Sequence, residues 1–204
     1  MALDIQANKK AFIELLQSTG REGIDDLIAY LEDGKNDFFN APASTRFHLN
    51  EEGGLCQHSL NVCKEGLMLY EHAVTERPEL ARVIKKDSVI VATLLHDLNK
   101  SDIYKRVMKR QKNAFGVWED VPGWDVDYSN LPLGHGEKSA IMALWSGFEI
   151  TEEELIAIRW HMTAWDLAFQ SPEQKNSINT ARDKYPLVAL VQLADGIATN
   201  IYEI

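Results

Sequence analysis

Apolar side chains recur at helical spacing through most of this chain. Between residues 4 and 33 the apolar positions fall three or four residues apart, with Gly20 and Gly34 as stops, which predicts a helical hairpin. The same periodicity predicts later helices over residues 55–75, 133–145, 152–162 and 187–202. Residues 35–54 and 171–179 are polar and irregular, which predicts loops.

One apolar run between these helices ends in two chemically active side chains. Residues 89–95 (VIVATLL) lead directly into His96 and Asp97, and Ser88 is a candidate N-cap. The run is short and rich in Val, Ile and Thr, so periodicity leaves a buried helix and a buried strand both open. A carboxylate inside an apolar environment is costly unless it is paired. The run therefore predicts that His96 and Asp97 have a charged partner, and we expect that partner to be a metal ion.

The helical pattern stops after residue 103. Gly116, Pro122 and Gly123 punctuate the segment that follows, which predicts a β-hairpin at 104–128 with its turn near Asn113–Gly116. Five cations in its first half form a basic cluster: Lys105, Arg106, Lys109, Arg110 and Lys112. Two interpretations of this cluster stay open, a solvated strand face and a surface that steers an anion toward a neighbouring site.

The composition is that of an ordinary globular protein, with 45% apolar and 25% charged residues among 204. This length predicts one domain, with room for a small appendage. The net charge of −10 disfavours a long, non-specific grip on a nucleic-acid backbone, which needs many clustered cations. It does not argue against a small phosphorylated substrate held by metal ions.

The chain shows neither a membrane-spanning stretch nor the basic-then-apolar start of a signal peptide. We therefore expect a cytoplasmic protein with no membrane partner. Cys56 and Cys63 lie seven residues apart on one face of a predicted helix, so we expect free, buried thiols rather than a disulfide. Oligomeric state is not predictable from this sequence.

Six metal-ligating residues stand at predicted helix ends or inside otherwise apolar helices: His58, His96, Asp97, His135, His161 and Asp195. With the adjacent His96 and Asp97 taken as one position, the successive steps are 38, 38, 26 and 34 residues, about one helical hairpin each. Such spacing allows successive helices to bring one end each to a common point. Four imidazoles and two carboxylates can hold one or two divalent transition-metal ions, iron or manganese first, with magnesium, nickel or zinc as alternatives.

Five segments, taken in order, resemble the HD-domain metal-dependent phosphohydrolase superfamily: GGLCQHSLNV, LLHDLNK, LGHGEKSA, IRWHM and LVQLADGIA. The resemblance covers roughly residues 42–200. It implies an all-α fold with a core of about five helices around the metal site. We therefore expect an N-terminal helical segment at 1–40, packed on an HD-type domain at 41–204 that carries the small inserted β-hairpin.

The resemblance also implies roles for single residues. His58, His96, Asp97 and Asp195 match the ligands of the first metal, and His135 and His161 match the additional histidines of the two-metal subgroup, with Asp97 bridging. Lys100 matches a lysine that binds phosphate and stabilises charge in the transition state. This sequence has Asn99 where the family often has glycine, and Met162 where some two-metal members carry a further histidine.

Four further residues are candidates for contact with a substrate. Arg46 and His48 lie in the loop before the helix that begins near residue 55, and Trp165 and Asp166 follow His161. Asp97 and Lys100 are the predicted catalytic residues.

The function that the resemblance implies is hydrolysis of a phosphoester, monoester or diester, in a nucleotide or short oligonucleotide by a hydroxide that bridges the metals. One alternative is an HD-type di-iron oxygenase, which uses the same ligand types. Another is a regulatory module in which bound metal only stabilises the fold.

Overall fold

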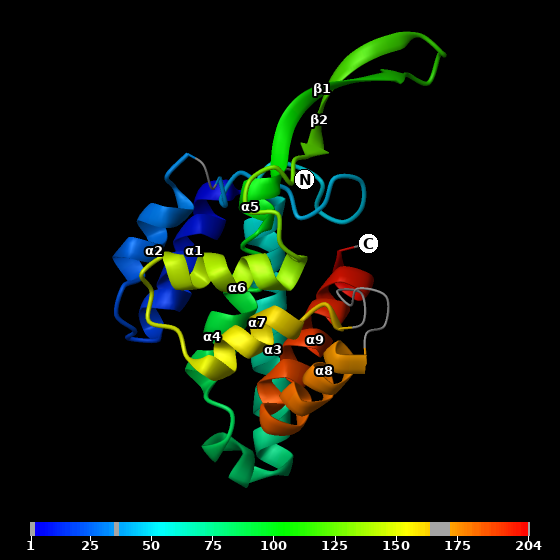
Figure 1. The fold of residues 1–204 in the computed structure, drawn as a ribbon. Coiled ribbons are helices and arrows are strands. Elements are labelled where there is room, and N and C mark those ends of the chain that lie inside the picture. The colour runs from blue at the N-terminus through cyan, green and yellow to red at the C-terminus, as the bar shows by residue number, and fades with distance from the viewer. Residues whose placement is uncertain (1–2, 35–36, 164–171, 204) are drawn as a thin grey trace.

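The structure is a computed structural model that describes residues 3–34, 37–163 and 172–203. The described residues form a mostly helical protein with one two-stranded antiparallel sheet (Figure 1). In chain order the elements are α1 (Ile5–Ser18), α2 (Ile24–Leu31), α3 (Gly54–Glu76), the 3-10 helix η1 (Pro78–Arg82), α4 (Lys86–Leu95), α5 (Lys100–Ile103), β1 (Tyr104–Lys112), β2 (Trp118–Val126), α6 (His135–Trp145), α7 (Glu152–Trp160), α8 (Pro172–Lys184), α9 (Pro186–Ile197) and the π-helical turn η4 (Ala198–Tyr202).

Helix α4 lies at the centre of the molecule. It packs against α1, α3, α7 and α9, and every residue from Ser88 to Leu95 is buried. A helix covered on all sides needs no polar face, and this explains why its sequence shows no helical periodicity. The helix ends at Leu95, and the next two residues, His96 and Asp97, are still buried.

The two N-terminal helices pack on this core, as their periodicity predicts. Phe12 and Leu16 of α1 and Leu27 of α2 are fully buried in the same hydrophobic cluster as α4. The aromatic rings of Phe12 and Phe38 lie 5.0 Å apart between centroids, so the segment after α2 closes over α1. Each of these contacts buries apolar surface that would stay exposed if α1 and α2 did not pack on the core.

The predicted β-hairpin is confirmed, and it projects from the helical body (Figure 1). Tyr104 pairs with Val126 at its base and Lys112 pairs with Trp118 at its far end. In the turn, the Asn113 side-chain oxygen accepts hydrogen bonds from the backbone N–H groups of Phe115 and Val117. An asparagine that replaces a backbone acceptor in this way is a common means of closing a turn.

Two local predictions are wrong, and one predicted helix begins two residues later than expected. Ser88 is the buried third residue of α4 rather than its N-cap, which is Lys85. The helix predicted from residue 133 begins at His135, because Gly134 has an extended conformation. The polar segment predicted as a loop forms the start of α8, and among the side chains described from residue 176 onward its buried apolar positions are Ile178 and Ala181. Two apolar residues in a polar helix give too weak a periodic signal to recognise.

Thr151 and Glu154 form a capping box at the start of α7. The prediction for the two cysteines is confirmed, because Cys56 and Cys63 are free and buried. No helix in the described part of the chain is long and apolar enough to cross a membrane.

Candidate metal centre

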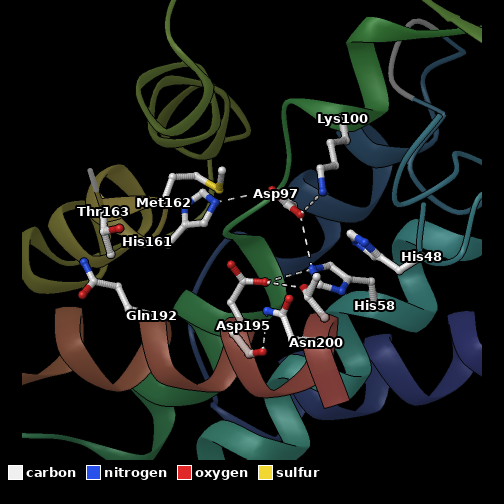
Figure 2. A pocket seen from close by; sticks show the side chains of 12 residues that line it. His48, His58, Asp97, Lys100, His161, Met162, Thr163, Gln192, Asp195 and Asn200 are labelled. Atoms are coloured by element: carbon white, nitrogen blue, oxygen red, sulfur yellow. Dashed lines mark hydrogen bonds and ion pairs between the residues drawn. The ribbon is translucent and has the colours of Figure 1, made fainter. Parts of the chain in front are cut away.

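The structure brings all six predicted ligands to one place. His58 lies near the N-terminal end of α3, His96 and Asp97 follow α4, His135 begins α6, His161 follows α7 and Asp195 lies in α9. His58, Asp97, His161 and Asp195 point toward one another in Figure 2. Five helices therefore contribute one end or one side chain each.

Two glycines allow the loop before α3 to lie close to the first turn of that helix. A Cβ atom on Gly54 would lie 2.0 Å from the carbonyl oxygen of Leu49, so only glycine fits there. Gly53 has a φ of +83°, which also favours glycine. This close approach holds His48 beside His58, with 5.2 Å between the ring centroids.

Asp97 is at the centre of the cluster, and each of its oxygens faces a different group of partners. Oδ2 lies 2.6 Å from Lys100 Nζ, 3.3 Å from His96 Nε2 and 3.4 Å from His58 Nε2. Oδ1 lies 2.6 Å from His135 Nε2 and 3.5 Å from His161 Nε2. A carboxylate with a separate set of neighbours on each oxygen is suited to bridge two cations.

The outer nitrogens of three histidines are held by hydrogen bonds. His96 Nδ1 donates to the Thr93 carbonyl and His161 Nδ1 donates to the Ile158 carbonyl, each at 2.7 Å. His58 Nδ1 contacts both carboxylate oxygens of Glu203, at 2.9 and 3.0 Å. A proton fixed on Nδ1 leaves Nε2 as the nitrogen with the free lone pair, which is the usual arrangement of metal-binding histidines.

The surroundings of His161 also fit a metal ligand. Its Nε2 is buried and has no hydrogen-bond partner among the described residues. A buried polar atom without a partner is destabilising, and a bound ion would satisfy this one.

The Nδ1 atom of His135 has a different kind of partner from those of the other histidines, because it lies 2.9 Å from the side-chain amide of Asn99. Asn99, which stands where the resemblance expects glycine, thus orients one of the predicted ligands.

The charges of the cluster depend on one another. Burial alone would raise the pKa of Asp97, but Lys100, His96 and His135 attract its charged form and hold the pKa well below its usual range. Burial alone would raise the pKa of Asp195, but the hydrogen bond with His58 and the attraction of the neighbouring imidazoles together lower it. Both carboxylates therefore stay ionised at neutral pH, as metal ligands must be.

The pKa values of two candidate ligands, His58 and His135, are displaced in opposite directions. Burial alone would lower the pKa of His58, but hydrogen bonds with Asp195, Asp97 and Glu203 raise it well above the usual value. The pKa of His135 is lowered, chiefly because burial disfavours the charged ring. In both cases the nearby carboxylates favour a positive charge, which a metal ion can supply in place of a proton.

Among the six predicted ligands there are three sets whose donor atoms all lie within 4.8 Å of one another: His58, His96 and Asp97; His96, His161 and Asp195; and Asp97, His135 and His161. Imidazole nitrogens with carboxylate oxygens suit iron, manganese and zinc. The donor types, the fixed Nδ1 atoms and the unpartnered His161 Nε2 therefore fit a metal ion. Two of the three sets share Asp97.

The cluster opens into a pocket of about 390 Å³ (Figure 2). Lys100 lines this pocket with its side chain 12% exposed. Burial alone would lower the pKa of Lys100, but its attraction to Asp97 raises it, so the amine stays charged. His48 also lines the pocket; its pKa is lowered by burial and by the neighbouring His58 and Lys100.

The other predicted contacts have mixed positions. Arg46 is exposed on the loop before α3 and is not among the described residues that line the pocket. Trp165 and Asp166 lie outside the described residues. Their roles in substrate binding stay predictions.

Glu203 belongs to the site although its sequence context did not point to it. Its side chain is 1% exposed, contacts His58 and accepts a hydrogen bond from Asn61. Glu203 lies just beyond the π-helical turn η4, eight residues after Asp195 in α9. No signal in the sequence points to it. The same holds for Gln192, Thr199 and Asn200, which line the pocket.

Searches of protein-family models, curated proteins and solved structures returned no match to this chain. The function of the site is therefore inferred from its own residues and geometry.

Proposed function

We propose that this chain is an HD-type metal-dependent phosphohydrolase that cleaves a phosphoester of a nucleotide or a short oligonucleotide. The observation that carries the proposal is the position of Lys100. Its ammonium group lies 2.6 Å from Asp97, the residue at the centre of the six candidate metal ligands. Lys100 also lines the pocket beside these ligands. A fixed cation beside a metal centre suits a substrate whose reacting group is an anion.

In this proposal the ligands fall into two groups that share Asp97. His58, His96, Asp97 and Asp195 hold the first ion, and Asp97, His135 and His161 hold the second. The short distances from Asp97 to the neighbouring imidazoles and its presence in two donor sets support Asp97 as the shared ligand. Bound ions would polarise a phosphoryl oxygen and supply a hydroxide at neutral pH.

The protein contributes positioning and charge. Lys100 binds a non-bridging phosphoryl oxygen and balances the negative charge that develops there, because its raised pKa keeps it protonated. Asp97 keeps this ammonium group in place through their ion pair. His96 and His161 cannot turn away from the site, since backbone carbonyls hold their Nδ1 atoms.

The pocket suits a small polar substrate. Its volume of about 390 Å³ is at the lower end of the range for small-molecule sites. Gln192, Thr199 and Asn200 place amide and hydroxyl groups in its wall. These groups can hydrogen-bond to a sugar or a base, and the volume limits the reacting centre to about one nucleotide.

The test begins with metal analysis of the purified protein, followed by a screen of phosphomonoesters, cyclic nucleotides and short oligonucleotides. Lys100→Met is expected to lower kcat about 100- to 1000-fold on any substrate found. Lys86→Met is the matched control, because Lys86 pairs with Glu71 on an exposed surface at the other end of α4. Equal activity of the two variants would contradict the role of Lys100.

Three outcomes would overturn the proposal as a whole. The first is a protein that binds no divalent metal at any concentration. The second is oxygen consumption by an iron-loaded protein that cleaves no phosphoester, which is the behaviour of an oxygenase. The third is tight metal binding without turnover of any substrate, together with a loss of stability in Asp97→Ala, which is the behaviour of a structural metal site.

A further inference from the structure

The projecting hairpin has two unlike faces. Side chains alternate along each strand, so the observed register assigns every residue of β1 and β2 to one face or the other. One face, here called the aromatic face, consists of Tyr104, Arg106, Met108, Arg110, Lys112, Trp118, Asp120, Pro122, Trp124 and Val126. The opposite face consists of Lys105, Val107, Lys109, Gln111, Glu119, Val121, Gly123 and Asp125.

The net positive charge of the hairpin is confined to the aromatic face. This face carries three cations and one acid, a net charge of +2, whereas the opposite face carries two cations and two acids, a net charge of zero. All three aromatic side chains of the two strands lie on the positive face. The whole chain has a net charge of −10, so the remainder carries −12. An anionic partner would therefore be attracted here and repelled elsewhere.

The aromatic face starts at the metal centre. Its first residue, Tyr104, follows α5, which begins with Lys100. Burial raises the pKa of Tyr104, and Lys100 and Asp97 are close enough to affect it as well. Next along this face, Arg106 forms a 3.1 Å ion pair with Glu52 in the loop before α3. The nine residues of β1, counted from Tyr104, extend this face about 30 Å from its base at about 3.3 Å per residue.

The outer part of this face is open. Met108 is 64% exposed and Trp118 is 56% exposed, and Lys112 lies over the Trp118 ring at 5.3 Å. In the turn, Phe115 is 90% exposed. A two-stranded hairpin has little stability alone, and exposed aromatic and apolar side chains next to a site commonly mark a contact surface.

We propose that the aromatic face binds a single strand of nucleic acid that extends outward from the metal centre. The proposal rests on the proposed function, because the strand is the part of an oligonucleotide substrate that lies beyond the scissile phosphoester. Bases stack on Trp118 and Trp124, while Arg110 and Lys112 contact phosphates. Aromatic platforms beside cations are the usual surface for single strands, and such binding needs no particular sequence.

Binding is measured on the full chain by fluorescence anisotropy with labelled ten-nucleotide oligothymidylate and oligouridylate, in chelator so that nothing is cleaved. Arg110→Gln/Lys112→Gln removes two charges from the aromatic face, and Lys105→Gln/Lys109→Gln removes two from the opposite face as the matched control. The first variant should lower the slope of log K against log salt by about 1.4, and the control should leave it unchanged.

Trp118→Ala tests stacking on the same probes. It is expected to weaken binding about 5- to 150-fold, which corresponds to the loss of one stacked base. Circular dichroism and the position of thermal unfolding show whether each variant keeps its fold. Equal effects of the aromatic-face variant and its control would overturn the proposal, and so would a wild-type chain that binds neither oligonucleotide.

Two results distinguish strand binding by the aromatic face from phosphoester cleavage and from self-association. A wild-type chain that binds the probes through the aromatic face but cleaves no phosphoester contradicts the proposed function alone. Sedimentation tests whether the face instead binds a second copy of the chain. Dissociation of an oligomer by Trp118→Ala, without any change in oligonucleotide binding, would overturn the proposal.

Discussion

Replacing Lys138 by methionine should destabilise the fold strongly. Lys138 is 2% exposed and forms an ion pair with Asp102, which is 4% exposed. The lysine also donates to the carbonyl oxygen of Asn130 at 2.7 Å, and the Asn130 amide donates to Asp102 at 2.9 Å. This network joins α5, the segment that follows the hairpin, and α6, which begins with His135.

The expected loss follows from burial. Methionine keeps most of the side-chain volume but leaves the Asp102 carboxylate buried without its cation. Breaking one side of a buried ion pair costs about 3–5 kcal/mol. For a chain of this length each kcal/mol shifts Tm by about 2–4 °C, so Tm should fall by about 6–20 °C. Replacing both partners, in Lys138→Met/Asp102→Leu, should recover most of the loss because no unpaired charge remains.

The measurement is urea unfolding followed by circular dichroism, with thermal unfolding as a second probe. Lys86→Met is the control, since the exposed Lys86–Glu71 pair contributes at most about 1 kcal/mol. A loss below about 1 kcal/mol for Lys138→Met would refute the reasoning. A double variant as unstable as the single one would refute it as well, because the cost would then come from packing rather than from an unpaired charge.

Three further predictions concern the site and the thiols near it. Glu203→Gln should weaken metal binding about 10- to 100-fold by calorimetry, since it removes the carboxylate that orients His58; unchanged affinity would contradict this role. The pKa of Asp97 is lower in the folded state than its unfolded value of about 3.9, so its charge stabilises the fold above that pH, and this stability is lost as pH falls through the folded pKa. Without metal, Asp97→Asn should therefore lose less stability than wild type when both are titrated with acid from about pH 5. Equal losses in the two proteins would refute this prediction. Burial raises the pKa of Cys56 to about 12 and that of Cys63 to about 11, so a thiol reagent at pH 8 should label both only after unfolding, and rapid labelling of the folded protein would be inconsistent with their burial.

The sequence by itself determined most helices, the hairpin with its turn, and the six residues that meet at the candidate metal centre. These features have local causes. A helix that is apolar on one side has a periodic sequence, a turn needs residues such as Asn113 and Gly116, and an acid within an apolar run such as Asp97 must be paired. Where the local cause is weak, as in α8, or absent, as in the buried part of α4 from Ser88 to Leu95, the sequence did not decide the structure.

Only the tertiary structure decided which distant groups support the site. Glu203 and His58 are 145 residues apart, and nothing in the sequence near either residue indicates their contact. Lys138 likewise finds Asp102 in another helix, and the register of the hairpin separates its charged positions into a positive face and a neutral one. Such pairings depend on how whole elements pack, because a buried charge is stabilised by whatever partner the packing places within reach, at any distance along the chain.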